Sequence, residues 1–161
     1  MLTNYQLLYI TTNHTCTQDA LDGIYSFDHI PLQVRKFPAF WICNNKDSNH
    51  EGEHWFACVF PGKHHPAEMF CSFGRSPQFY SQQLEDILKS NSNGTYVYNK
   101  TQVQKDNSTA CAYFTLYYVD RRCRGISIDN CIENLSPLEL EQNEEIVVDY
   151  VRNHMMSDRN N

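Results

Sequence analysis

Short apolar runs bounded by turn-forming residues fill the middle of the chain. Four of them have the length of a strand and are followed directly by asparagine, proline or glycine: residues 39–43, 54–60, 68–73 and 95–98. We predict strands over these residues. Residues 3–12 fit a short helix or a strand, and the pattern does not decide between them. Residues 19–23 indicate a short helical turn closed by glycine, and residues 25–38, with two prolines, an irregular connection.

The pattern changes to a helical period after residue 80. Residues 81–89 place their apolar side chains on one face, and Asn93-Gly94 ends the segment. Residues 112–119 are apolar nearly all round, which is typical of a helix that is buried on every side. We expect this central helix to continue to about Arg122, with Ser108 in the preceding polar loop as its N-cap.

A third helix is predicted from a group of start signals. Ser136 is a suitable N-cap, Pro137 suits the first helical position, and Glu139 completes a capping box. The helix should reach about His154 and bury its apolar side chains, which are Leu138, Ile146, Val147, Tyr150 and Val151. Strands lie in the middle of the chain and helices towards its ends. The order of elements therefore predicts an α+β fold, in which a small sheet packs against the central helix.

Composition narrows the class of protein. At 161 residues, of which 41% are hydrophobic and 13% aromatic, the chain can bury a core, and we expect one domain over residues 1–161. The net charge of −6 and the scattered Lys and Arg residues argue against nucleic-acid binding as the main activity. No apolar run reaches the length of a membrane span, and a signal peptide is not expected. The seven cysteines lack a disulfide spacing, so we expect reduced thiols in cytosol or nucleus.

Cys111 is the candidate nucleophile. If Ser108 is the N-cap, Cys111 lies in the first helical turn, where unpaired N–H groups and the helix dipole stabilise a thiolate. A small buried apolar cysteine is the ordinary alternative. Two residues elsewhere favour catalysis. His54 follows a polar loop and could act as the base, and the amide of Gln104 could line an oxyanion hole with the backbone N–H of Cys111.

The segments around these candidates resemble a known family. They are residues 52–55 (GEHW), 70–74 (FCSFG) and 104–114, in which Gln104 precedes Cys111 by seven residues. They are similar to the adenain-like cysteine proteases, which comprise the adenovirus endopeptidase and relatives encoded by Polinton/Maverick-type elements, within the broad group of the SUMO-specific proteases. Residues 23–26 and 41–44 extend the resemblance over most of the chain.

The resemblance implies a small mixed sheet packed against a buried central helix that carries Cys111, a reordered papain-like fold. It implies a thiol endopeptidase with His54 as base and Gln104 in the oxyanion hole, acting as a monomer without metal or cofactor. Its substrates would be viral or transposon structural precursors such as capsid proteins, in the host nucleus, the cytosol or the virion. The stimulation of the adenovirus relative by DNA and by a peptide is not carried over, because this chain is acidic and no residue matches the peptide's site.

Two positions depart from the family pattern. The family has Asp or Glu before its Ser/Pro-Phe-Gly turn, where this chain has Cys71, and Gly after the nucleophile, where it has Ala112. Alanine is a good helix former, so Ala112 is a minor change. A thiol accepts the hydrogen bond of the imidazole N–H only weakly, so Cys71 should impair activity. The alternative is therefore a catalytically inactive homologue that serves as a binding or virion-assembly module. A metal site made of Cys71, His54 and Cys111 is a third hypothesis.

Overall fold

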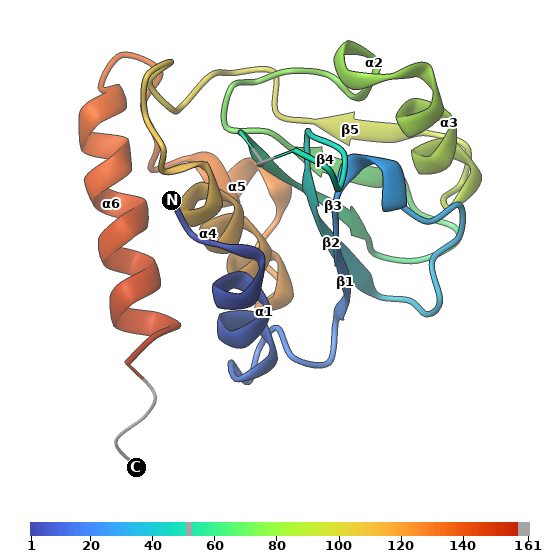
Figure 1. Ribbon diagram of the computed structural model, residues 1–161, viewed down its shortest axis with the longest axis horizontal. Helices are drawn as coiled ribbons and strands as arrows, with labels where there is room; N and C mark the ends of the chain where they lie inside the picture. Colours follow the sequence, from blue (N-terminus) through green and yellow to red (C-terminus); the bar gives the residue numbers. More distant parts are fainter. Residues whose placement is uncertain (51–52, 158–161) are drawn as a thin grey trace.

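A mixed β-sheet crosses the computed structural model, which describes residues 1–50 and 53–157 (Figure 1). Its strand order is β1-β2-β3-β4-β5, with the outer pairs β1–β2 and β4–β5 parallel and the two inner pairs antiparallel. The strands are β1 (Leu21–Tyr25), β2 (Ala39–Asn44), β3 (Trp55–Phe60), β4 (Ala67–Phe70) and β5 (Tyr96–Tyr98). The helices are α1 (Asn4–Thr12), α2 (Pro77–Tyr80), α3 (Gln82–Ser90), α4 (Cys111–Cys123), α5 (Ile128–Ile132) and α6 (Leu140–His154), and η1 (Phe27–His29) is a short 3₁₀ helix.

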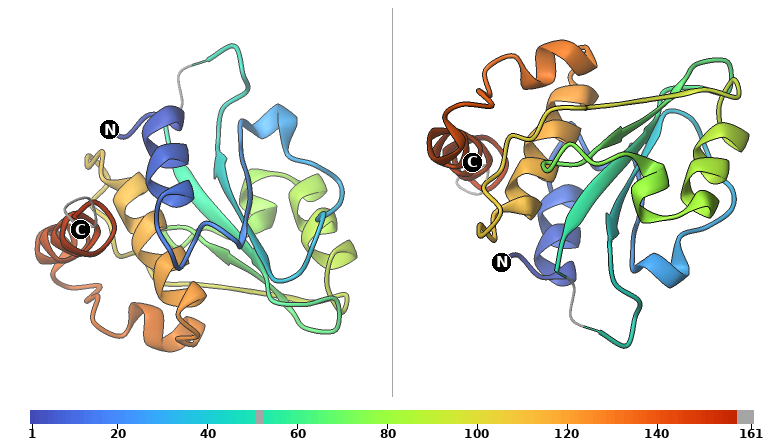
Figure 2. Two further views of the ribbon diagram at one scale, coloured as in Figure 1. Left: turned by 90° about the horizontal axis from the view of Figure 1, so that it is seen from below. Right: turned by 90° about the horizontal axis from the view of Figure 1, so that it is seen from above.

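The two faces of the sheet pack into separate hydrophobic cores. On β3, residues 55, 57 and 59 belong to the core that α1, α4 and α6 share, whereas residues 56, 58 and 60 belong to the core shared with α3. Figure 2 shows α1, α4 and α6 on one side of the sheet, and α2 and α3 on the other. Because both faces are covered, all six residues of β3 are buried. This explains why its apolar run is continuous rather than alternating.

Helix α4 is the buried central helix that the sequence predicts. Its residues 114–120 are all buried. The hydroxyl of Tyr118 donates a hydrogen bond to the Glu68 carboxylate of β4 at 3.0 Å, and Arg122 donates two to the same carboxylate, at 2.7 and 2.6 Å. The buried carboxylate is thus paired by a bidentate guanidinium and a phenol, so its charge is well compensated. These bonds fix α4 on the sheet and thereby the position of its first residue, Cys111.

Most predicted elements of the middle of the chain are confirmed. The four predicted strands correspond to β2, β3, β4 and β5, the helix over residues 81–89 corresponds to α3, and residues 3–12 form a helix, α1. The helical turn predicted for residues 19–23 is wrong, because β1 begins at Leu21. The backbone of β1 pairs with β2, with Gly23 opposite Trp41. Pairing with a neighbouring strand overrides the local preference of this segment.

The predicted N-cap of the central helix is wrong. Helix α4 begins at Cys111, and its N-cap is Ala110, which makes no side-chain capping bond. The Ser108 hydroxyl oxygen accepts a hydrogen bond from the backbone N–H of Ala110 at 3.1 Å, and the hydroxyl donates to Glu144 of α6 at 2.6 Å. Ser108 therefore ties the loop to α6 instead of capping α4.

The start of the C-terminal helix also differs from the prediction. Helix α6 begins at Leu140 with Glu139 as N-cap, and Leu138 is 91% exposed, so its expected burial is wrong. The side chain of Asn143 explains this, because it bonds both the N–H and the carbonyl of Ser136, at 2.8 and 2.7 Å. These bonds hold Ser136 in a separate turn. In the described part of the chain, no helix is long and apolar enough to cross a membrane.

Candidate active site

One edge of the sheet brings His54 and Cys71 together. Strand β3 begins at Trp55 and β4 ends at Phe70, and the two strands are antiparallel with Ala57 opposite Phe70. The residue before β3 and the residue after β4 therefore lie side by side. These residues are His54 and Cys71, and His54 Nε2 lies 3.4 Å from Cys71 Sγ.

The start of α4 brings Cys111 to the same edge. One turn along the helix, the hydroxyl of Thr115 lies 3.2 Å from the carbonyl oxygen of Trp55 and 2.9 Å from that of Cys111. The backbone of Trp55 also hydrogen-bonds to the Cys111 thiol, in the sense that favours the thiolate. Cys111 therefore lies against the residue that directly follows His54.

The side chain of Gln104 lies between the end of β4 and the loop that enters α4. Its backbone N–H donates to the carbonyl of Ser72 at 3.1 Å, and the Ser72 hydroxyl donates to its Oε1 at 2.5 Å. Its Nε2 donates to the carbonyl of Ser108 at 3.0 Å. The residue is fully buried and its amide bonds to Ser72 and Ser108, so the amide is held in one orientation.

The two ring nitrogens of His54 have different surroundings. Nε2 faces Cys71, whereas Nδ1 is buried and has no hydrogen-bond partner among the described residues. The ring stacks on Phe73, with centroids 4.6 Å apart and planes inclined by 30°. A buried polar atom without a partner costs free energy and points to a function. Because Cys71 occupies Nε2, Nδ1 is the ring nitrogen still open to a partner among the described residues.

Burial favours the neutral forms of Cys111 and His54 in this structure. Cys111 is 1% exposed, and burial raises the pKa of its thiol more than the backbone hydrogen bonds from Trp55 and Ala112 lower it. His54 is 3% exposed, and burial, followed by the positive charge of Arg75, lowers its pKa to about 4. In this state desolvation outweighs the stabilisation of a thiolate that the helix start suggests, because burial disfavours the charged form.

We expect His54 to make the folded state lose stability as the pH falls from about 6.5 to about 4. In this window the unfolded chain protonates the residue at its ordinary pKa of 6.5, whereas the folded chain holds it neutral. The unfolded state therefore binds more protons, and a pKa difference of about 2.5 corresponds to about 3 kcal/mol. Urea unfolding across this pH range measures the effect. As the pH is lowered, the free energy of unfolding should fall more steeply for the wild type than for His54→Gln. If the two plots of this free energy against pH are parallel, the lowered pKa of His54 is contradicted.

Three residues that complete the site were not predicted from the sequence. Asn99 holds the backbone of Cys71, accepting from its N–H at 2.8 Å and donating to its carbonyl at 2.6 Å. The hydroxyl of Tyr80 lies 3.3 Å from Cys71 Sγ. The guanidinium of Arg75 lies over the Phe73 ring, 4.9 Å from its centroid. In the sequence these residues resemble ordinary turn and surface positions, and only the fold brings them to Cys71.

The hypothesised metal site of Cys71, His54 and Cys111 is not formed by the described residues. Cys71 belongs to the core on the α3 side of the sheet and Cys111 to the core on the α4 side. The two thiols therefore lie on opposite faces of the sheet. Within the parts of the chain that the structure describes, a different group of residues brings metal-ligating atoms together.

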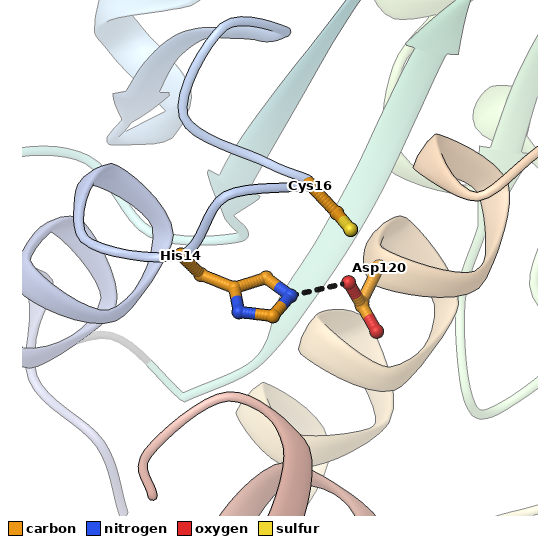
Figure 3. Close-up of side chains that lie close together, drawn as sticks. All are labelled: His14, Cys16 and Asp120. Atoms are coloured by element: carbon orange, nitrogen blue, oxygen red, sulfur yellow. Dashed lines mark hydrogen bonds and ion pairs between the residues drawn. The ribbon is translucent and has the colours of Figure 1, made fainter. Parts of the chain in front are cut away.

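That other group lies near the C-terminal end of α4 (Figure 3). His14, Cys16 and Asp120 present ligand atoms within 4.8 Å of one another, and His14 Nε2 lies 2.7 Å from Asp120 Oδ1. The other carboxylate oxygen, Oδ2, accepts hydrogen bonds from Arg124 at 2.9 Å and Tyr150 at 2.6 Å. The guanidinium already supplies a positive charge at this carboxylate. We interpret the group as an ion-pair network that joins α4 to α6 and to the segment after α1.

Comparison with solved structures places the fold. The chain aligns with a crystal structure of ASFV pS273R protease at a TM-score of 0.58 and 16% identity, over 96% of this chain and 67% of that one. The chain has the fold of the ASFV pS273R protease. The crystal structure of the Se-Met form aligns at a TM-score of 0.47 and 18% identity, over 72% of this chain and only 43% of that one. No family model matches the sequence, and no curated protein does.

The similarity to the ASFV pS273R protease confirms the predicted α+β fold class. A mixed sheet packs against helices, with the central helix α4 buried between the sheet and α6. At 16% identity the similarity establishes the fold alone, because one fold can carry different activities.

Proposed function

We propose that this chain is an adenain-like thiol endopeptidase that processes viral or transposon structural precursor proteins. The observation that carries the proposal is the arrangement of His54. Its Nε2 faces Cys71 at 3.4 Å, and its buried Nδ1 has no partner among the described residues. The helix that begins at Cys111 contacts Trp55, the residue after His54, and Gln104 bonds to Ser72, the residue after Cys71. The fold that the chain shares with a protein named as a protease is in accord with this assignment.

The reaction begins when a peptide carbonyl reaches Cys111. The thiol proton passes to Nδ1 of His54 as the sulfur–carbon bond forms, and the carbonyl oxygen becomes an oxyanion. One hydrogen of the Gln104 amide is donated to Ser108, and the second, with the backbone N–H of Cys111, donates to the oxyanion. The imidazolium then protonates the leaving amine. Water, deprotonated by His54, hydrolyses the thioester and restores the thiol.

An inactive binding or assembly module is the second candidate, and the burial of the site favours it. Cys111, His54 and Gln104 are 1%, 3% and 0% exposed, so a peptide reaches them only after covering atoms have moved. An endopeptidase must therefore open this site when it binds its substrate. A module that only binds or assembles has no need to open it.

Incubation with a library of peptides from a digested proteome, followed by mass spectrometry, distinguishes the two candidates. An endopeptidase should produce new termini at internal bonds, and small residues such as glycine should be frequent next to those bonds. Pretreatment of the protein with a thiol alkylator under conditions that modify Cys111 should remove these products. If neither the wild type nor the Cys71→Asp variant cleaves any peptide, the inactive module is the correct assignment.

Cys71→Asp should increase turnover. The Cys71 side chain is fully buried, and His54 Nε2 and the Tyr80 hydroxyl, both able to donate, lie 3.4 and 3.3 Å from its sulfur. A carboxylate there would accept from both groups, stabilise the imidazolium and raise the pKa of His54. In a serine protease, replacing the triad carboxylate by a neutral amide costs about 10⁴-fold in turnover, and a cysteine nucleophile should depend on it less.

The comparison that checks this prediction is between Cys71→Asp and Cys71→Ala. Turnover and thermal unfolding of both variants are measured with the wild type. The aspartate variant should be faster than the wild type and the alanine variant no faster. If the aspartate variant is folded but no faster than the alanine variant, Cys71 does not stand in the acid position.

A further inference from the structure

Tyr80, the last residue of α2, is connected to His54 through the thiol of Cys71. Tyr80 Oη lies 3.3 Å from Cys71 Sγ, and the same sulfur lies 3.4 Å from His54 Nε2. The ring of Tyr80 stacks on Phe56, with centroids 4.9 Å apart and planes inclined by 25°, which fixes the position of the hydroxyl. Cys71 is 0% exposed, so water does not compete for its proton.

The single proton of the Cys71 thiol determines which tautomer of His54 is present. If the S–H group points at Nε2 of His54, that nitrogen must be unprotonated, and a neutral ring carries its proton on Nδ1. His54 cannot then accept the proton of Cys111. If the S–H group points at the oxygen of Tyr80 instead, Nε2–H donates to the sulfur and Nδ1 keeps its lone pair. Only the second arrangement provides a base.

We propose that Tyr80 is a positioning residue that selects the basic tautomer of His54 by accepting the proton of the Cys71 thiol. A phenol oxygen accepts as well as donates, and the half-buried Tyr80 can direct its own O–H elsewhere. Arg75 is the charged group nearby, since its charge affects the pKa of both Tyr80 and His54. It has no lone pair, so it does not replace Tyr80 as the acceptor. The effect on turnover rests on the proposed function, but the tautomer is a property of the resting protein.

Nitrogen-15 NMR of the His54 ring in the full chain tests the proposal at neutral pH. The pKa of about 4 keeps the ring neutral there, and couplings from the ring protons show which nitrogen is protonated. The wild type should show Nε2–H, and Tyr80→Phe should shift the ring towards Nδ1–H while keeping the stack on Phe56. Tyr96→Phe is the matched control. It removes a tyrosine hydroxyl that donates to Glu85 at 3.0 Å, away from Cys71, and should leave the tautomer unchanged.

A rescue variant separates positioning from a merely structural role. An ionised aspartate only accepts hydrogen bonds, so Cys71→Asp should hold Nε2–H even when Tyr80 is phenylalanine. Tyr80→Phe should lower kcat about tenfold with little change in KM, as the fraction of the basic tautomer falls. The Cys71→Asp/Tyr80→Phe double variant should recover both the tautomer and kcat.

Two NMR results would overturn the proposal: an Nδ1–H tautomer in the wild type, or the same tautomer in Tyr80→Phe as in the wild type. A double variant that keeps the Nδ1–H form would also overturn it. These outcomes are independent of the proposed function, which fails instead if no peptide is cleaved or if cleavage persists without Cys111. The tautomer measurement then still decides the role of Tyr80.

Discussion

Cys111→Ala should abolish peptide cleavage and leave the protein folded. Without the sulfur no thioester can form, and loss of a nucleophile in related mechanisms lowers turnover by about 10⁴-fold or more. The side chain is 1% exposed, and replacing its sulfur by hydrogen should cost about 1 kcal/mol in stability. In a chain of this size that lowers Tm by about 2–4 °C. Turnover of a cleaved peptide and a thermal unfolding curve measure the two effects together.

Cys131→Ala is the matched control for this variant. Cys131 is also a buried cysteine of the α4 core, but it lies on α5 and its sulfur donates to the carbonyl of Ile126 at 3.5 Å. Its replacement should cost a similar amount of stability and leave turnover unchanged. Cleavage by Cys111→Ala at the original rate would end the assignment of the nucleophile. Equal losses of turnover in both variants would show that packing, rather than chemistry, is being measured.

The sequence predicts the central elements because their patterns are unambiguous. Strands β2 and β3 and residues 112–119 of helix α4 are apolar nearly all round, and burial on both faces is the physical cause. Strand β1 could not be predicted in this way, because it contains Asp22 and a glycine and acquires its structure from β2. Asp22 is tolerated there because it accepts hydrogen bonds from Trp41 Nε1 at 2.8 Å and from Arg35 Nε at 2.7 Å. Both partners are distant in the sequence.

The candidate site was predictable as a set of residues but not as an electrostatic environment. The family resemblance selects His54, Cys71, Gln104 and Cys111. In the structure His54 contacts Cys71, Gln104 bonds to Ser72 beside Cys71, and the helix that begins at Cys111 contacts Trp55 beside His54. A sequence shows that a cysteine follows a loop, and a helix start suggests a thiolate. It does not show that Cys111 is desolvated, and desolvation determines the direction of its pKa. The role proposed for Tyr80 depends on a contact through Cys71 that no spacing rule contains.

Gln104→Ala should lower kcat by about 10²–10³-fold. A single side-chain donor to an oxyanion contributes about 2.7–4 kcal/mol to transition-state binding, because it acts in a site from which water is excluded. Gln104 is fully buried, and its amide is fixed by the Ser72 hydroxyl and the Ser108 carbonyl. It is therefore pre-oriented, as an oxyanion donor must be. Single-turnover kinetics with a cleaved peptide measure the loss, and KM should change little.

The same hydrogen bonds give Gln104 a structural role, which has to be separated from catalysis. Alanine leaves the buried Ser108 carbonyl without its donor, and an unsatisfied buried group costs about 1–3 kcal/mol. Ser72→Ala is the matched control, because it removes the other bond to this amide and keeps the amide N–H groups. It should lower kcat less than tenfold, since the donor to the oxyanion remains. In Gln104→Ala the rate at which a small alkylator labels Cys111 should stay near the wild-type rate, because the thiol itself is unchanged. If that rate changes in proportion to kcat, Gln104 holds the loop before α4 and has no part in stabilising the oxyanion.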